Sequence, residues 1–264
     1  MTSLLLLSAA LAAIAYLFTA LRAAQARDSG PVLLVLIAAV VLHSIVLIAS
    51  VQAVGGRLGL TQALSLLTWQ SALLLGLLSG VATLRPLRTA IYPLAAAGVA
   101  LAAVWPTQPG GNAPHDWRIA LHAALSIFAA GLLTLAAAQA IALDVLDRLL
   151  HKPDQLARVL RMPPMQASED WLFQLIGAGF FVLSLALLSG LIFVDDLFAQ
   201  HLVHKTVLSI IAWLIFAALL LGRRRWGWRG KRAVRWALSG YGALLLAYFG
   251  SKLVLEQILG RHWT

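Results

Sequence analysis

Long apolar runs constrain this chain more than any other feature of its sequence. A helix that crosses the hydrocarbon core of a membrane needs about 20 mainly apolar residues, and eight stretches meet that requirement. They cover residues 3–21, 31–53, 62–84, 87–105, 117–142, 171–194, 207–221 and 233–253. Only 11% of the residues are charged, against about 25% in a soluble domain. We therefore expect an all-α, polytopic membrane bundle of eight transmembrane helices that forms a single integral membrane domain over residues 1–264.

Prolines affect two places in this pattern. Pro93 interrupts the fourth stretch, 87–105, so that span is the least regular of the eight. The polar connection from Asp144 to Asp170 contains the run Met162-Pro163-Pro164-Met165, which cannot continue a helix. We interpret this connection as a short surface excursion and not as a second domain.

The first stretch has some features of a secretory signal peptide. Ala24-Gln25-Ala26 has the small-residue form of a cleavage site, but no Lys or Arg precedes the apolar run, and Arg22 and Arg27 follow it. A signal peptide begins with a positively charged region. We therefore expect an uncleaved first span whose N-terminus faces outward.

Basic residues are distributed unevenly among the short connections. Most of them follow the first, third, fifth and seventh stretches: Arg22, Arg27, Arg85, Arg88, Arg148, Lys152, Arg158, Arg161, Arg223, Arg224, Arg225, Arg229, Lys231, Arg232 and Arg235. Connections rich in Lys and Arg stay on the cytoplasmic side, which predicts that both termini face outward. The net charge of +10 is thereby assigned to topology and to contact with anionic membrane lipid, and it does not indicate a nucleic-acid partner.

Few polar side chains fall inside the predicted spans, and those that do are candidates for function. They are His43, the run Trp69-Gln70-Ser71, and His122. At about 1.5 Å per residue, His43 lies roughly 15 Å and His122 roughly 8 Å below the outer ends of their helices. Two neutral imidazoles on separate helices are what a bis-histidine haem site needs. Arg118 lies four residues before His122 on the same face and could pair with a haem propionate.

Other interpretations of these polar residues stay open. Either histidine could instead hydrogen-bond to a backbone carbonyl or to Gln70 and hold helices together. A second group in the outer connection after the sixth span could bind a divalent metal ion, although its spacing matches no zinc signature. This group consists of Asp195, Asp196, His201, His204 and Lys205.

Several classes of protein are excluded by what the sequence lacks. The chain has no cysteine, which excludes a disulfide framework, a thiolate metal site and covalent CxxCH haem attachment. It also lacks the GxSxG, P-loop, HExxH and dinucleotide-binding motifs, so nothing in it indicates an enzyme. The predicted spans carry no central Asp, Glu, Lys or Arg before the eighth, which disfavours an ion-coupled transporter of small solutes or cations.

The second half of the chain contains an ordered series of motifs. Among them are Trp171-Leu172-Phe173, Ser189-Gly190-Leu191-Ile192-Phe193 and Gly227-Trp228-Arg229-Gly230-Lys231-Arg232. This series resembles the membrane cytochrome c assembly family of CcsA/CcmC-like proteins, in particular its smaller YpjD-type branch. The resemblance covers residues 120–253, and the first half fits by its number of spans.

The resemblance implies a haem-handling protein of the bacterial inner membrane. The segment Leu121-His122-Ala123 is similar to the family segment whose histidine serves haem from the outer side. We therefore expect non-covalent haem b, with His122 as one iron ligand, His43 as the second and Arg118 at a propionate. The sequence departs from the family in lacking a tryptophan-rich outer loop, a histidine where Leu221-Gly222 stands, and the family's late outer histidine, which would follow Gly250 in a Gly-Leu-His-Ser-Tyr-like context. These departures motivate the alternative, a non-enzymatic accessory or scaffold subunit that works with a membrane protein partner and has lost haem delivery.

Overall fold

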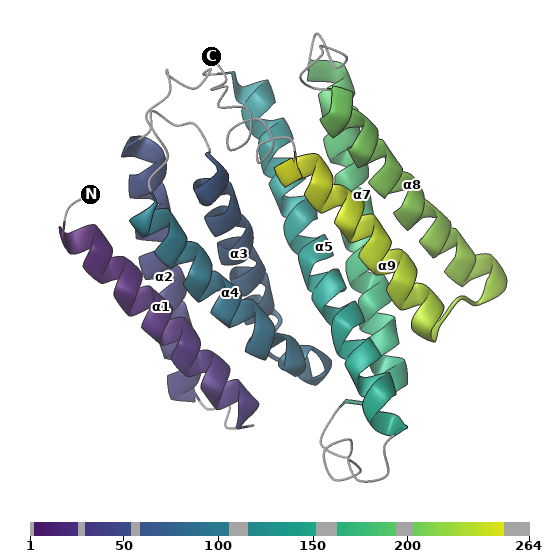
Figure 1. Cartoon of the computed structure of the whole chain (residues 1–264), viewed down its shortest axis with the longest axis horizontal. Coiled ribbons are helices and arrows are strands. Elements are labelled where there is room, and N and C mark those ends of the chain that lie inside the picture. The colour runs from purple at the N-terminus through teal and green to yellow at the C-terminus, as the bar shows by residue number, and fades with distance from the viewer. Residues whose placement is uncertain are drawn as a thin grey trace. The chain divides into compact units, whose positions relative to one another are not determined.

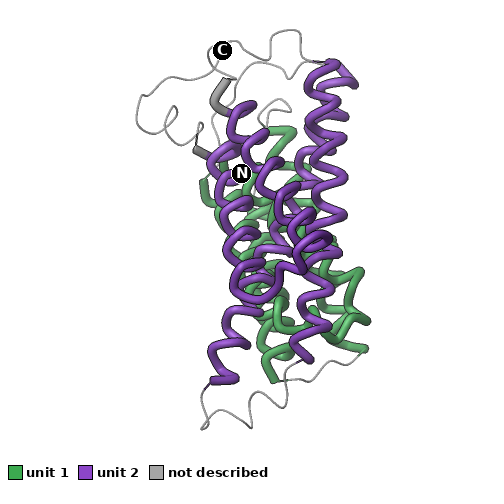
Figure 2. Tube along the Cα trace, turned by 90° about the vertical axis from the view of Figure 1, so that its right-hand side faces the viewer, with its two compact units in different colours: residues 1–114, 264 green, residues 115–263 purple. Residues whose placement is uncertain are grey.

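The structure is a computed structural model that describes residues 3–25, 30–53, 59–105, 116–151, 163–193 and 203–250. These residues form eight α-helices and contain no β-strand. The helices belong to two compact units, the first ending at Pro114 and the second running from His115 to Trp263 (Figures 1 and 2). The predicted all-α class is confirmed.

The first unit is a bundle of four helices. It contains α1 (Ser3–Ala24), α2 (Gly30–Ala53), α3 (Leu60–Leu77) and α4 (Arg85–Val104), and a short 3-10 turn, η1 (Ala82–Leu84), precedes α4. α1 packs along α2 and α4, and α3 packs along both α4 and α2 (Figure 1). One cluster in its core consists of small and medium side chains that let the helices approach closely: Ala9, Ala12, Val46, Val99 and Ala103.

Helix α4 continues through its internal proline. Pro93 lies inside the span Arg85–Val104, although proline lacks the N–H that a helix interior normally uses. Gly98, further along α4, lies directly against the side chain of Thr68 on α3, and a Cβ atom there would collide with the Thr68 hydroxyl. The close approach of α3 and α4 therefore depends on this glycine.

The second unit is also a bundle of four helices. It contains α5 (Trp117–Leu150), α7 (Met165–Phe193), α8 (Val203–Trp226) and α9 (Gly230–Leu245), which continues into a π-helical turn, η3 (Leu246–Gly250). α5 packs along α7 and α9, and α8 packs along the same two helices (Figure 1). Each helix thus has two neighbours in the bundle.

The polar connection predicted between the fifth and sixth spans is helical at both of its ends. Asp144 and Asp147 lie in the last turns of α5, and Glu169 and Asp170 lie near the start of α7. Helix α7 begins at Met165, directly after Pro164. The prediction that residues 144–170 form one loop was therefore wrong at both ends, since polar side chains also occupy helix turns that extend beyond an apolar span.

Seven of the described helical segments are long and apolar enough to cross a membrane. α9 has 16 residues, and the predicted eighth span, 233–253, ends outside the described residues. Large apolar side chains cover the outward faces of the helices, among them Leu4, Ile14, Leu34, Phe181 and Leu214, as expected for contact with lipid. The chain is a multi-pass membrane protein, while the count of eight spans and the outward orientation of both termini remain predictions.

Candidate functional site

His122 lies in the second turn of α5 and faces α7. Its side chain is half-buried, and its Nδ1 atom lies 3.0 Å from the Ala186 carbonyl oxygen and 3.0 Å from the Ser189 hydroxyl oxygen. The ring rests against Gly190, where an added Cβ atom would lie 3.0 Å from the His122 Cε1 atom. One turn of α7 therefore holds this imidazole in one orientation.

These contacts decide which ring nitrogen of His122 is available. A carbonyl oxygen only accepts hydrogen bonds. We therefore assign the proton to Nδ1, which donates a hydrogen bond to the Ala186 carbonyl oxygen. In the neutral ring the lone pair then resides on Nε2, which has no hydrogen-bond partner among the described residues. Histidines that ligate metal ions almost always donate their other ring N–H to such a partner, so the environment of His122 fits an iron ligand.

The start of α5 brings an exposed cation next to His122. Asp116 caps the helix by accepting the Arg118 backbone N–H at 2.9 Å, and this cap fixes where the helix begins. The Arg118 guanidinium lies 5.9 Å from the ring centroid of Trp117, whose ring contacts Phe193 at a centroid distance of 5.9 Å. Arg118 has no ion pair among the described residues, and it shares a helix face with His122.

His43 lies in the core of the first unit and is completely buried. Its Nε2 atom lies 2.8 Å from the Ser65 hydroxyl oxygen on α3. Its ring meets the edge of Tyr16 on α1 at a centroid distance of 5.8 Å, and Tyr16 in turn stacks on Tyr92 of α4. The buried Nδ1 atom of His43 and the buried hydroxyl of Tyr16 have no hydrogen-bond partner within the described residues, which marks an unsatisfied polar place in an otherwise apolar core.

The two histidines thus have different surroundings. Arg118 and His122 both lie in the first turns of α5, and His122 contacts α7, whereas His43 lies among side chains of α1, α3 and α4. They belong to separate compact units, which Figure 2 shows in different colours. Joint coordination of one iron by His43 and His122 therefore remains a prediction.

The polar run in α3 holds helices together. The Trp69 indole N–H donates to the Val40 carbonyl oxygen at 3.2 Å and to the Ser44 hydroxyl oxygen at 3.0 Å, both on α2. Gln70 is buried, and the Ser71 hydroxyl donates to Leu67 in its own helix. These hydrogen bonds support the interpretation that Trp69 connects α3 to α2.

The second predicted group, around His201, lies mostly outside the described residues. Asp195, Asp196 and His201 fall there entirely. Among the residues that the structure describes, no three His, Cys, Asp or Glu side chains come close enough to hold a metal ion. A divalent metal site in this connection remains a prediction.

Sequence reasoning missed the residues that position the two histidines. Ser189 and Gly190 were recognised only as part of a motif, and Ser65 and Tyr16 were not recognised at all. A single glycine in an apolar helix is a weak signal, because its role depends on which ring lies against it. These partners can be identified only from the packing of α7 against α5. Ala186, for example, is 64 positions from His122 in the sequence.

Several known proteins are similar to parts of this chain. Inner membrane protein YpjD of Escherichia coli is 35% identical over 168 residues, which cover 64% of this chain and 64% of that protein. An uncharacterized 28.8 kDa protein of Azospirillum brasilense is 37% identical over 154 residues, 57% of this chain and 56% of its own length. The cytochrome c biogenesis protein CcsA of Synechococcus elongatus is 28% identical over 112 residues, 40% of this chain and 34% of that protein.

In each of these relatives the matched region spans less than two thirds of the relative's length. No solved structure matches the chain. The membrane-length helices and the similarity to an inner membrane protein agree with a multi-pass inner membrane location. The model of the cytochrome c assembly protein family matches residues 1–259. The chain therefore belongs to the cytochrome c assembly protein family.

Proposed function

We propose that this protein binds or passes haem b, held without a covalent bond, beside the start of α5. Cytochrome c assembly proteins are associated with haem, the group that cytochrome c carries. A chain with no cysteine cannot form the thioether links of a c-type haem, so haem would be held without a covalent bond, and histidine is one of the side chains that can ligate its iron. The chemistry that haem would supply is its own iron, and the role of the protein is to bind and orient it.

The orientation of His122 is the observation that carries this proposal. The Nδ1–H group is engaged by the Ala186 carbonyl oxygen at 3.0 Å, so the Nε2 lone pair is free for an iron atom. A fixed tautomer with a backbone acceptor behind the ring is the usual arrangement of a haem or metal ligand. The ring is only partly buried, so part of it stays accessible.

Arg118 and the neighbouring aromatic rings support the same location. Haem carries two propionates, and an arginine without an acidic partner pairs well with a carboxylate. Trp117 and Phe193 form an edge-to-face pair next to this arginine, and aromatic side chains provide apolar contact for a porphyrin. Charge and apolar surface are thus combined within the first turns of α5.

His43 is proposed as the second ligand on narrower grounds. Its Nδ1 atom is buried and lacks a partner within the described residues, and coordination would satisfy it. Its Nε2 atom already contacts Ser65 at 2.8 Å. If His43 ligates iron, Nδ1 is therefore the atom available, or the contact with Ser65 must break.

Visible absorption spectra of the detergent-purified protein test this function. We expect a Soret band after haem supplementation, its loss in His122→Ala, and partial recovery when imidazole is added to that variant. His151→Ala is a matched control, because His151 lies at the other end of α5 and also directs Nδ1 to a backbone carbonyl, that of Asp147 at 2.7 Å. His43→Ala should shift the band if His43 is the second ligand and leave it unchanged if His43 is structural.

A second candidate function follows from the packing of Gly222. At this position, where the family resemblance implies a histidine at the inner end of the span, the ring of Trp228 lies so close that no Cβ atom could be accommodated. This observation favours an accessory subunit that retained the fold and lost haem delivery. A colourless protein that gains no Soret band from added haem and co-purifies with a membrane partner would support it over the first proposal.

A further inference from the structure

The turn between α8 and α9 is held in a defined conformation. Gly227 and Gly230 have φ angles of +63° and +56°, a left-handed conformation that glycine adopts without steric cost. Between them, the Trp228 N–H donates to the Gly222 carbonyl oxygen at 3.2 Å. The Trp228 ring stacks near Trp226 and Trp236, at centroid distances of 6.0 and 5.2 Å. Contacts among three indole rings therefore help to hold the turn in this conformation.

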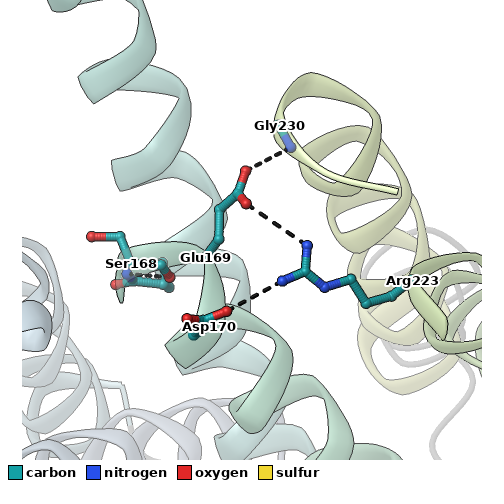
Figure 3. Close-up of polar contacts among 6 residues, drawn as sticks. Ser168, Glu169, Asp170, Arg223 and Gly230 are labelled. Atoms are coloured by element: carbon teal, nitrogen blue, oxygen red, sulfur yellow. Dashed lines mark hydrogen bonds and ion pairs between the residues drawn. The ribbon is translucent and has the colours of Figure 1, made fainter. Parts of the chain in front are cut away.

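A buried carboxylate ties this turn to α7. Glu169 accepts the Gly230 N–H at 2.7 Å, and its other oxygen lies 3.9 Å from the Arg223 guanidinium (Figure 3). Arg223 also contacts Asp170 at 3.2 Å, as the dashed lines in Figure 3 show. The acidic side chains next to the turn thus contact Arg223 and the backbone N–H of Gly230.

The acidic side chains of α5 are also engaged. Asp147 contacts Lys231 at 3.3 Å and Asp144 contacts Arg148 at 2.6 Å. The described carboxylates at this end of the unit therefore neutralise Arg223, Lys231 and Arg148. Other arginine side chains at this end of the unit have no such acidic partner among the described residues.

Four arginines at the turn have no acidic partner among the described residues. These residues, which we call the arginine cluster, are Arg224, Arg225, Arg229 and Arg232. All four are exposed, and Arg232 lies over the Trp228 ring at 5.2 Å. The exposed Trp226 indole, with 66% of its surface accessible, lies in the same turn. A tethered set of guanidinium groups beside indole rings is well suited to a phosphate diester.

An apolar stripe on α8 leads to the arginine cluster. Its members recur every three or four residues and so share one helix face: Val207, Ile211, Leu214, Ala218 and Leu221. The four larger side chains are exposed by 41–53%, and the small Ala218 between them is partly exposed. Arg225 is the next position of the same stripe, four residues after Leu221.

We propose that the arginine cluster and this stripe form a binding site for one class of ligand, anionic phospholipid. The phosphate diester would contact Arg225 and Arg229, and the acyl chains would lie along α8. An acidic protein or a nucleic acid could satisfy the cations but would not cover an apolar face of membrane length. A phospholipid has a charged headgroup for the arginine cluster and acyl chains for the adjoining apolar stripe. In this arrangement Trp226 would lie at the interfacial depth that tryptophan prefers. The orientation predicted from the basic residues assigns this lipid to the cytoplasmic leaflet.

Native mass spectrometry of the detergent-solubilised full chain tests this site. Phosphatidylglycerol and phosphatidylcholine are added in separate titrations, and the bound lipids are counted. The test variant is Arg225→Gln/Arg229→Gln. We expect phosphatidylglycerol to bind about twenty-five-fold more weakly to this variant, because each of the two cations removed contributes on the order of a fivefold change in affinity at an anionic surface. Phosphatidylcholine binding should change little.

A matched control separates a specific site from general charge. Arg148→Gln/Lys231→Gln removes the same number of charges from the same end of the unit, but from residues that are already paired with Asp144 and Asp147. We expect less than about a twofold change in this control. Arg225→Lys/Arg229→Lys keeps the charge and should retain intermediate affinity, so a folding defect in the glutamine variant cannot imitate the result.

Three outcomes would overturn the proposal. If the test and control variants lose the same affinity for phosphatidylglycerol, binding depends on total charge and not on these two arginines. If phosphatidylglycerol and phosphatidylcholine bind equally well, the net negative charge of the lipid plays no part. Displacement of the bound species by an acidic peptide or by single-stranded nucleic acid, without any effect of phosphatidylglycerol, would assign the arginine cluster to a different partner.

Discussion

The Glu169 carboxylate accepts the Gly230 backbone N–H at 2.7 Å and thereby connects the first turns of α7 to the first residue of α9 (Figure 3). Glu169 is buried, and Arg223 lies next to its second oxygen. A buried carboxylate persists when hydrogen bonds and an opposite charge compensate for its lost hydration. This contact joins two helices through residues that are 61 positions apart along the chain.

Removing this carboxylate should loosen the second unit. Glu169→Ala leaves the Gly230 N–H without its acceptor and leaves Arg223 with Asp170 as its acidic partner, and an unsatisfied buried group costs about 1–3 kcal/mol. We expect a lower thermal unfolding temperature in detergent. Glu169→Gln keeps an acceptor for the N–H and should lose less stability. Equal stability of all three proteins would contradict the assignment of Glu169 as a structural anchor.

Gly190 should be intolerant of a side chain because of His122. In Gly190→Ala the new Cβ atom would lie 3.0 Å from the His122 Cε1 atom, so the imidazole must shift by a few tenths of an ångström from its place beside Gly190. We expect altered haem spectra in this variant. Gly177→Ala on the same helix meets no atom within 4 Å and should be neutral or stabilising by about 0.5–1 kcal/mol. Identical spectra for Gly190→Ala and the unchanged protein would show that haem binding does not depend on the packing of the His122 ring against Gly190.

Gly222 and Gly242 offer a second matched pair of glycines. Gly222→Ala places a Cβ atom against the Trp228 ring, whereas Gly242→Ala on α9 meets nothing within 4 Å. Overpacking of this kind costs about 1–3 kcal/mol. We expect a lower melting temperature and a shifted tryptophan emission for Gly222→Ala only. If both variants melt alike, Trp228 is not fixed on α8.

Ser65 should stabilise the first unit through His43. Ser65→Ala removes the 2.8 Å contact with His43 Nε2 and leaves a fully buried imidazole with a further unsatisfied nitrogen, which costs about 1–3 kcal/mol. Ser71→Ala is the control, because the Ser71 hydroxyl bonds within its own helix, to Leu67. Unfolding followed by circular dichroism in detergent should separate the two variants, and similar melting temperatures would contradict a structural role for the Ser65–His43 pair.

The sequence predicted the helices well where their length depends on apolar content. The stretch 87–105 agrees with α4, Arg85–Val104, and 31–53 agrees with α2, Gly30–Ala53. It predicted the C-terminal end of α5 and the start of α7 poorly. Helix propensity continues beyond the hydrocarbon core, and α5 with its 34 residues is longer than the roughly 20 that the core requires.

Part of the candidate site was also accessible from sequence. The spacing of Arg118 and His122 implies a shared helix face, and α5 indeed contains both residues. The residues that orient the imidazole, Ala186 and Ser189, could not be predicted, because a backbone carbonyl carries no side-chain signature. Glu169 was assigned to a loop, so its burial against Gly230 was missed.

The sequence alone determined that this chain is a helical membrane protein, because apolar length and the scarcity of charge leave a helix as the structure that satisfies every backbone polar group in lipid. It also led to the prediction of His43 and His122 as iron ligands. The tertiary structure decided which nitrogen of His122 stays available and which arginines stay uncompensated. Both depend on helices that are distant in sequence, since a hydrogen bond or an ion pair forms only when packing brings the two groups within about 3–4 Å.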